Sequence, residues 1–249
     1  MIIIEDTRQQ RLKHNYKRDY FRSQGIIVRK ETLSCGDYTL INDRSIVIDT
    51  KKDIQELIGD IQVKQAPLKE ITPAVEAIFE KYKIKGLLPE TIIRMIYDSD
   101  EGRYPERDIL EICNKFEIDD DAEKEFQKLY VKRRGFFHRG LKRAEFGDVK
   151  LYVLVENQGG LVNGTRDIFN KTVRNIDDLF SWKNPRLFIR IGGRQKYPNA
   201  MKGETLAKAC LTMQKKYGME FLFCPPQDSG RKIIELLGGA KPNGDIQKC

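Results

Sequence analysis

The sequence predicts an α/β fold, in which a mixed central sheet is flanked by helices and interrupted by an all-helical insertion. Short apolar runs of strand length alternate with helix-spaced segments at the start of the chain and again in its second half. Residues 64–130 lie between these regions, carry helix-spaced apolar residues and four prolines, and contain no convincing strand. We therefore expect a core from residues 1–63 and 131–238, a helical insertion at 64–130, and a disordered tail at 239–249.

The first part of the core is expected to run β-α-β-β-β-α. The run MIIIED predicts a buried strand, HNYKRDYFRSQ a helix that stops at Gly25, and GIIVRKETL a second strand. Two short stretches, Tyr38–Ile41 and Ser45–Ile48, flank the turn-forming residues 42–44 and predict a β-hairpin. The segment KDIQELIGDI then places its apolar residues on one face of a helix.

The second part of the core repeats this alternation. FFHRGLKRAEF predicts a helix, KLYVLVEN a strongly apolar central strand, and RLFIRIGG another strand. MKGETLAKACLTMQKKYG predicts a helix that is closed by Gly218. MEFLFCPP predicts a strand that stops at Pro225, and QDSGRKIIELLGG predicts the last helix.

Bulk composition restricts the class of protein. No apolar run approaches the ~18 residues of a membrane span, and the start MIIIEDTRQ lacks the features of a signal peptide. The five scattered cysteines indicate reduced thiols, and two histidines argue against a histidine-rich zinc site. These features predict a cytoplasmic protein, with the nucleus as the alternative location.

The charge is distributed unevenly along a chain of net charge +8. Residues 98–125 contain twelve acidic and four basic residues, a local charge of −8, so the remainder carries +16. Basic residues interleaved with aromatic ones crowd residues 131–143 and 171–196. This pattern suits a nucleic-acid phosphate backbone, although a solvated charged face explains the charge equally well.

The hairpin also carries the candidate site. If it forms, Asp37, Asp49 and Lys51 meet near one end of the sheet, because residues two apart share a strand face. Two carboxylates suit a hard cation such as Mg²⁺ or Mn²⁺, which lowers the pKa of a bound water, and the lysine can orient that water. Asp6, at the end of the first strand, could join them. The alternative is that the Asp-x-Lys spacing arises by chance and that Asp37 caps a turn.

Three short motifs and the order of elements resemble the nuclease domain of the XPF family of structure-specific DNA endonucleases. The motifs are Asp6-Thr7-Arg8, Gly36-Asp37-Tyr38 and Asp49-Thr50-Lys51, the last in the place of the family's Glu-Arg-Lys. The resemblance covers Met1–Val63 and Tyr130–Leu237, and it implies a restriction-endonuclease-like fold of the PD-(D/E)xK superfamily. Thr50 replaces the family's arginine, Gln9 replaces an acid, and no tandem helix-hairpin-helix module follows.

The resemblance implies a metal-dependent DNA endonuclease that acts on branched or flapped DNA in replication, recombination or repair. It implies that Asp37 and Asp49, helped by the Thr50 carbonyl and by Asp6, hold Mg²⁺ or Mn²⁺ while Lys51 positions the attacking water. The residues expected to contact phosphates are Arg8, Lys52, Arg139 and Arg143, the last two alternatively lying on a solvated helix face.

Two other functions stay open. One is a catalytically weak DNA-binding or scaffolding relative, because the Glu-Arg-Lys motif is altered. The other is a Holliday-junction resolvase, which shares the chemistry but requires a symmetric dimer. DNA with junctions between single and double strands is the expected partner in each case, together with a homodimer or a protein partner.

Overall fold

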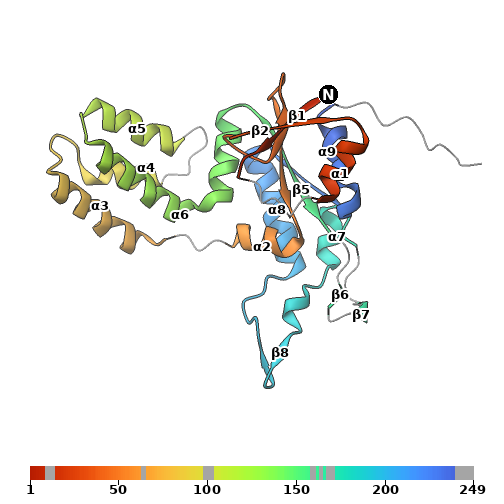
Figure 1. Cartoon of the computed structure of the whole chain (residues 1–249). Helices are drawn as coiled ribbons and strands as arrows, with labels where there is room; N and C mark the ends of the chain where they lie inside the picture. The colour runs from red at the N-terminus through yellow and green to blue at the C-terminus, as the bar shows by residue number, and fades with distance from the viewer. Residues whose placement is uncertain are drawn as a thin grey trace, which may run out of the picture. The chain divides into compact units, whose positions relative to one another are not determined.

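The computed structural model describes residues 1–8, 15–62, 66–97, 104–157, 161–162, 165–166 and 172–238. Gln9 and the predicted tail at 239–249 lie outside the described residues. The chain forms two compact units, Met1–Ile58 with Asp148–Cys249 and Gly59–Gly147, called here the core unit and the helical unit. The predicted mixed sheet flanked by helices is confirmed (Figure 1).

The first half of the core unit follows the predicted order of elements. Its elements are β1 (Ile2–Asp6), α1 (Asn15–Ser23), β2 (Ile27–Glu31), β3 (Tyr38–Leu40), β4 (Ile46–Lys51) and α2 (Ile54–Ile61). The second half contains β5 (Lys150–Glu156), β6 (Leu161–Val162), β7 (Thr165–Arg166), α7 (Ile176–Ser181), α8 (Gly203–Tyr217), β10 (Glu220–Cys224) and α9 (Ser229–Leu236), with a short 3₁₀ turn, η2 (Pro226–Asp228), before α9.

Six strands form the central sheet in the order β10-β5-β4-β3-β1-β2. The β3 strand pairs antiparallel with both β1 and β4, which confirms the predicted hairpin. The remaining neighbours, β1 with β2, β4 with β5 and β5 with β10, pair in parallel. The apolar run KLYVLVEN is β5, buried between two parallel partners as predicted.

One face of the sheet packs against α1 and α9. Tyr38 and Ile48 from the hairpin join Phe21 of α1 and Ile233 of α9 in one buried apolar cluster. The ring centroids of Phe21 and Tyr38 lie 5.8 Å apart. Because successive strand residues point to opposite faces, the neighbours of these hairpin residues project from the other side of the sheet.

The run RLFIRIGG, predicted as one strand, contributes only a two-residue strand, which lies outside the central sheet. Its first residues form a 3₁₀ turn, η1 (Pro185–Leu187), and the rest enters a two-stranded hairpin of β8 (Arg190–Ile191) and β9 (Arg194–Gln195). The physical reason is charge. Arginines recur along this segment, and a strand buried between two others could not leave them in water.

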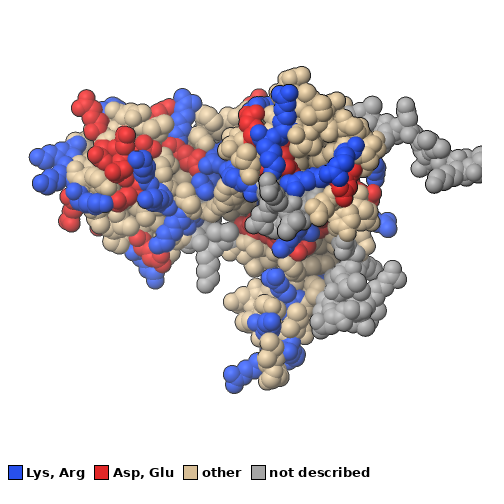
Figure 2. Space-filling view, viewed as in Figure 1, with Lys and Arg blue, Asp and Glu red and all other residues tan. Residues whose placement is uncertain are grey.

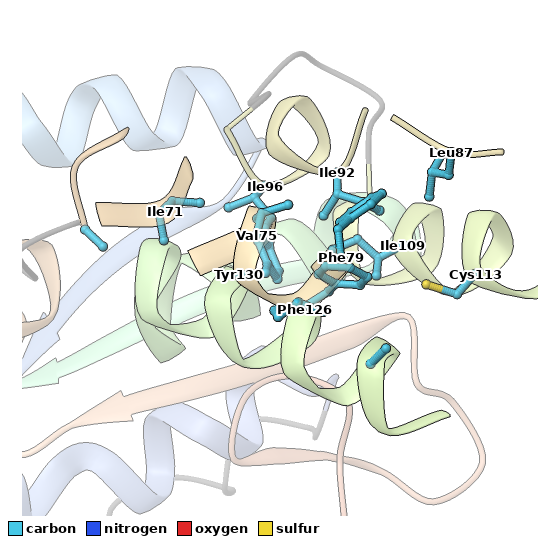
Figure 3. Close-up of a cluster of buried hydrophobic side chains, with 13 residues drawn as sticks. Ile71, Val75, Phe79, Leu87, Ile92, Ile96, Ile109, Cys113, Phe126 and Tyr130 are labelled. Carbon is cyan, nitrogen blue, oxygen red and sulfur yellow. The ribbon is translucent and has the colours of Figure 1, made fainter. Parts of the chain in front are cut away.

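The helical unit contains α3 (Leu68–Tyr82), α4 (Pro89–Tyr97), α5 (Pro105–Lys115) and α6 (Asp120–Phe146). Phe79, Ile92, Ile109 and Phe126 come one from each helix and meet in a single buried cluster (Figure 3). The segment FFHRGLKRAEF is the last part of α6, beyond a kink at Gly135, and it lies within the helical unit. In the part of the chain that the structure describes, no helix combines the length and apolarity needed to cross a membrane.

Candidate functional site

Three aspartates align across neighbouring strands of the central sheet. The β1–β3 ladder pairs Glu5 with Tyr38, so the next step of the register sets Asp6 opposite Asp37. The β3–β4 ladder pairs Tyr38 with Ile48, so its next step sets Asp37 opposite Asp49. Backbone hydrogen bonds hold this row, since Asp6 N donates to Asp37 O over 2.8 Å and Asp37 N donates to Ile48 O over 2.8 Å.

Gly36 allows Asp37 to reach this position. The backbone at Gly36 has a φ of +65°, in the left-handed region that residues with side chains avoid. A Cβ atom there would lie 2.2 Å from Val47 Cγ1 and 3.1 Å from the carbonyl oxygen of Ile48. Glycine before Asp37 is therefore required by both the conformation and the close approach to β4.

The buried Asp37 carboxylate is fixed by Thr50. Its Oδ2 accepts hydrogen bonds from Thr50 N at 2.7 Å and from Thr50 Oγ1 at 2.6 Å. Burial and the charge of Asp49 together raise the pKa of Asp37 to about 7, against the opposing hydrogen bonds from Thr50. The raised pKa follows from the burial of Asp37 away from water and from the closeness of the Asp49 carboxyl group. Thr50 thus acts through its side chain and N–H, which the sequence interpretation had not anticipated.

Lys51 lies beside Asp49 on the same strand. Its Nζ is 3.0 Å from Asp49 Oδ2, and the lysine is buried while Asp49 is partly exposed. Spacing by two along β4 gives both side chains the same face of the sheet. The lysine charge also acts on Asp37, whose pKa it lowers against the stronger effects of burial and of Asp49. Asp37, Asp49 and Lys51 therefore form one electrostatically linked group.

Asp6 and Arg8 form a separate ion pair at the end of β1. Arg8 Nε donates to both carboxylate oxygens of the buried Asp6, at 3.1 and 2.9 Å, and Arg8 Nη2 also contacts Oδ2. Arg8 Nη2 further donates to Leu33 O over 2.6 Å. The guanidinium that we expected to contact phosphate is thus engaged with Asp6, and the Asp6 charge is balanced within the fold.

The other expected phosphate contacts differ from one another. Lys52 is exposed directly after Lys51, where a ligand at the site could meet it. Arg139 and Arg143 are mostly buried, and both bind Glu106 of α5, with nitrogen–oxygen distances of 3.0 and 2.8 Å. Hydrogen bonds from Arg143 lower the pKa of Glu106, although burial acts to raise it. The phosphate role expected for Arg139 and Arg143 stays a prediction, and in this structure both side chains belong to the ion-pair cluster around Glu106.

Sequence reasoning missed a second set of buried charges in the core unit. Lys17 of α1 pairs with Glu156 at the end of β5, and both are buried. Glu5 of β1 accepts hydrogen bonds from Tyr38 Oη at 3.1 Å and from Arg18 Nη2 at 3.1 Å. No short motif joins these pairs, because Lys17 and Arg18 reach their partners through the packing of α1 on the sheet, whereas Tyr38 reaches Glu5 through the β1–β3 ladder.

The residues present fit a small divalent cation better than a large one. The structure records no hydrogen bond to Asp37 Oδ1 among the described residues, and Asp49 lies opposite. Within those residues, no group of three or more His, Cys, Asp or Glu is arranged to hold a metal. Mg²⁺ is commonly held by one or two carboxylates and retains several waters, whereas Ca²⁺ takes six to eight oxygen ligands. A pair of carboxylates therefore matches Mg²⁺ chemistry.

Comparisons with known proteins add a structural likeness only. No family model matches the chain, and no curated protein matches it. The structure is similar to XPF from Aeropyrum pernix, with a TM-score of 0.35 and 13% sequence identity over 95% of this chain and 63% of that one. A complex of XPF from Aeropyrum pernix with DNA aligns with a TM-score of 0.37 and 14% identity over 99% of this chain and 69% of that one.

Proposed function

We propose that this chain is a Mg²⁺- or Mn²⁺-dependent DNA endonuclease that acts on branched or flapped DNA. The observation that carries the proposal is the group of Asp37, Asp49 and Lys51 at the ends of β3 and β4. Burial and the neighbouring carboxylate raise the pKa of Asp37 to about 7. Bringing two carboxyl groups together in this way destabilises the charged pair unless a cation joins them.

Each residue of the group has a distinct part in phosphodiester hydrolysis. Asp37 and Asp49, with the Thr50 carbonyl, would hold the ion. A bound divalent cation lowers the pKa of a coordinated water and neutralises charge on the attacked phosphate. Lys51, held 3.0 Å from Asp49, presents an ammonium that can orient the water and stabilise charge developing on the phosphate oxygens.

Substrate recognition would use cations outside this group. Lys52 is exposed next to Lys51 and can contact the phosphate backbone on either side of the scissile bond. Asp6 supports the site from beside Asp37, because Arg8 balances its charge. Arg8 would therefore act by holding Asp6 rather than by contacting DNA.

A catalytically weak DNA-binding protein is the second candidate function. Two observations favour it: no third acidic residue completes the pair among the described residues, and Lys51 already neutralises part of Asp49. Such a protein would bind branched DNA without cutting it. Cleavage and binding must therefore be measured separately.

Cleavage of labelled fork, flap and four-way DNA with and without Mg²⁺ tests the proposal. Asp37→Asn and Asp49→Asn should each abolish cleavage, and Lys51→Ala should slow it by about 100- to 1000-fold. Asp19→Asn is the matched control, because Asp19 is an exposed aspartate of α1 that pairs with the equally exposed Arg22. Binding to the same DNA should change by less than about threefold, or ~0.6 kcal/mol, in all four variants. Retained cleavage in either site aspartate variant contradicts the site, and binding without cleavage in the parent favours the second candidate.

A further inference from the structure

The core unit carries a projecting basic segment at residues 183–202, called here the basic hairpin. It connects α7 to α8 and consists of η1, β8 and β9 with their linkers. Figure 1 shows it extending away from the central sheet. Almost every residue from Arg186 to Asn199 is exposed or half-buried, so this segment is not part of the apolar core.

The base of the basic hairpin is fixed by one buried side chain. Asn184 is 0% exposed and its Nδ2 donates to Met201 O over 2.8 Å, which joins the two ends of the segment. Its Oδ1 accepts a hydrogen bond from Gln55 Nε2 over 2.7 Å. Gln55 belongs to α2, the helix that begins three residues after Lys51. The hairpin is thus anchored to the helix that follows the candidate site.

The outer part of the hairpin is preformed as well. Lys196 N donates to Ile189 O over 2.8 Å, and β8 pairs antiparallel with β9. The turn between them is Gly192-Gly193, with φ values of +56° and +77°. Positive φ at both central positions is the requirement of a type I′ turn, the two-residue turn that matches the twist of paired strands. Little conformational entropy would therefore be lost when the hairpin binds a ligand.

The charge of the hairpin has one sign. Residues 183–202 contain six basic residues and no acidic residue, and all six are exposed. Figure 2 shows this projection with blue side chains and no red on the visible face. The basic residues are Lys183, Arg186, Arg190, Arg194, Lys196 and Lys202. Such a surface complements a polyanion.

Two large apolar side chains are exposed among these cations. Phe188 is 56% exposed and Ile191, directly before the Gly-Gly turn, is 63% exposed. Side chains of this type on nucleic-acid-binding proteins enter between base steps and unstack them, while flanking cations bind the phosphates. In a regular duplex the base faces are stacked and offer no apolar surface to these side chains. Where bases are already unstacked, the face of the last base pair is available for contact.

We propose that the basic hairpin is a pin that inserts at the junction between paired and unpaired DNA. Its cations contact phosphates on both strands, and Ile191 and Phe188 pack against the terminal base pair of the duplex. The proposal rests on the proposed function and narrows it, because the Asn184–Gln55 contact fixes the pin relative to the candidate site. The site would then cut at a set distance from the branch.

An anionic lipid surface is the other polyanion that a basic, apolar-tipped hairpin could meet. Nucleic acid is favoured because the hairpin is anchored to the helix that follows the candidate site, and because only two large apolar side chains are exposed on it. Vesicles of phosphatidylserine provide the direct comparison in the test below.

The test measures base unstacking without cleavage. Forked DNA carries the fluorescent base 2-aminopurine in the pair next to the branch, and the buffer contains EDTA. The parent protein should raise the fluorescence, and Ile191→Ser and Phe188→Ser should each remove most of that rise while circular dichroism stays unchanged. Leu211→Ser is the matched control, because Leu211 is an exposed apolar residue of α8 outside the hairpin. It should behave as the parent does.

The phosphate contacts are tested by salt dependence. Arg190→Ala combined with Arg194→Ala should flatten the plot of log affinity against log salt by about 1.4 to 1.8, the loss of two contacts to single- or double-stranded DNA. The proposal of a pin is contradicted if the parent gives no fluorescence rise or if both apolar variants give the same rise as the parent. It is also contradicted if the double arginine variant keeps the parent's salt slope, or if the protein binds the vesicles more tightly than forked DNA.

The pin and the nuclease can fail independently. If cleavage depends on Asp37 and the hairpin variants give an unaltered fluorescence rise, the proposed nuclease activity is supported and the proposed pin is rejected. If unstacking depends on Ile191 and no Mg²⁺-dependent cleavage occurs, the proposed pin is supported and the proposed nuclease activity is rejected.

Discussion

Asp37 shows how neighbouring residues set the character of a single carboxyl group. Two hydrogen bonds from Thr50 fix one of its oxygens, while burial and the charge of Asp49 raise its pKa to about 7. Thr50 thus positions Asp37, across the hairpin, through its hydroxyl and its backbone N–H. Threonine, with a short β-branched side chain suited to a strand, can do this within the sheet.

The stability of the metal-free protein should depend on pH through Asp37. Its folded pKa of about 7 lies above the ordinary value of 3.8, so the folded state keeps a proton that the unfolded chain releases. Stability contributed by this group therefore falls as the pH rises from about 4 to about 7. Asp37→Asn should remove that fall, which thermal unfolding in EDTA measures.

The same variant separates titration from metal binding. At pH 8 the melting temperature should be higher for Asp37→Asn than for the parent in EDTA, with little difference at about pH 3, where the carboxyl is mostly protonated in both the folded and the unfolded state. Adding Mg²⁺ at pH 8 should raise the melting temperature of the parent and not of the variant. If the melting temperatures of the two proteins change with pH in parallel, Asp37 is not the group whose raised pKa makes stability depend on pH.

At the scale of the element, alternation and turn residues made most strands and helices predictable from the sequence. The hairpin of β3 and β4 was predicted from two apolar stretches around a turn, and its register follows from that turn. The segment RLFIRIGG was not predictable in this way. Its alternation is that of a half-buried strand, but its recurring arginines keep it out of the central sheet, and β8 pairs instead with β9 in a separate hairpin.

The ion-pair cluster between α5 and α6 was also beyond sequence reasoning. Residues 98–125 are acidic and residues 131–143 are basic, and separately each pattern indicates a charged surface. In the structure Glu106 from the first segment binds Arg139 and Arg143 from the second. Pairing between segments is a property of packing, so the roles of those arginines could not be read from local spacing.

Glu106→Gln should destabilise the helical unit by about 2 kcal/mol at pH 7, since it weakens charge-assisted hydrogen bonds to two mostly buried guanidinium groups. The folded pKa of Glu106 is lowered, so this stabilisation is present above the unfolded value of about 4.5 and is lost as the pH falls through the folded value. Chemical unfolding followed by circular dichroism at pH 7 and pH 3 measures both effects.

Glu111→Gln is the matched control for this prediction. Glu111 pairs with Arg107 on the same helix, and both side chains are more than half exposed. Its loss should change stability by less than about 0.5 kcal/mol. Equal effects of the two substitutions would mean that the Glu106 cluster does not hold α5 to α6.

At the scale of the whole molecule, the net positive charge belongs to the core unit. The helical unit contains seventeen basic and eighteen acidic residues, a net charge of −1, so the core unit carries +9. All of the proposed metal-binding and water-orienting residues, and the basic hairpin, lie in the core unit. The helical unit should therefore be dispensable for chemistry and for the non-specific part of DNA binding.

Replacing residues 64–147 with a Gly/Ser linker tests this division of labour. With the core still folded by circular dichroism, cleavage should stay within about threefold of the parent and the salt dependence of DNA binding should not change. A flatter salt dependence would show that cations of the helical unit contact DNA. Lost cleavage in the folded variant would show that the helical unit contributes to the site.

The pairing of β4 with β5 has a consequence for how the chain folds. Ile46 of β4 pairs with Lys150 of β5, so these neighbouring strands of the sheet pair across 104 positions of sequence. Closing a flexible loop of that length costs about 4 kcal/mol by the logarithmic scaling of loop entropy. A helical unit that folds first, from mostly local contacts, shortens the loop that remains to be closed. If this is so, Glu106→Gln should lower the refolding rate measured by stopped-flow fluorescence by more than it raises the unfolding rate. That result would show that early folding of the helical unit speeds the pairing of β4 with β5.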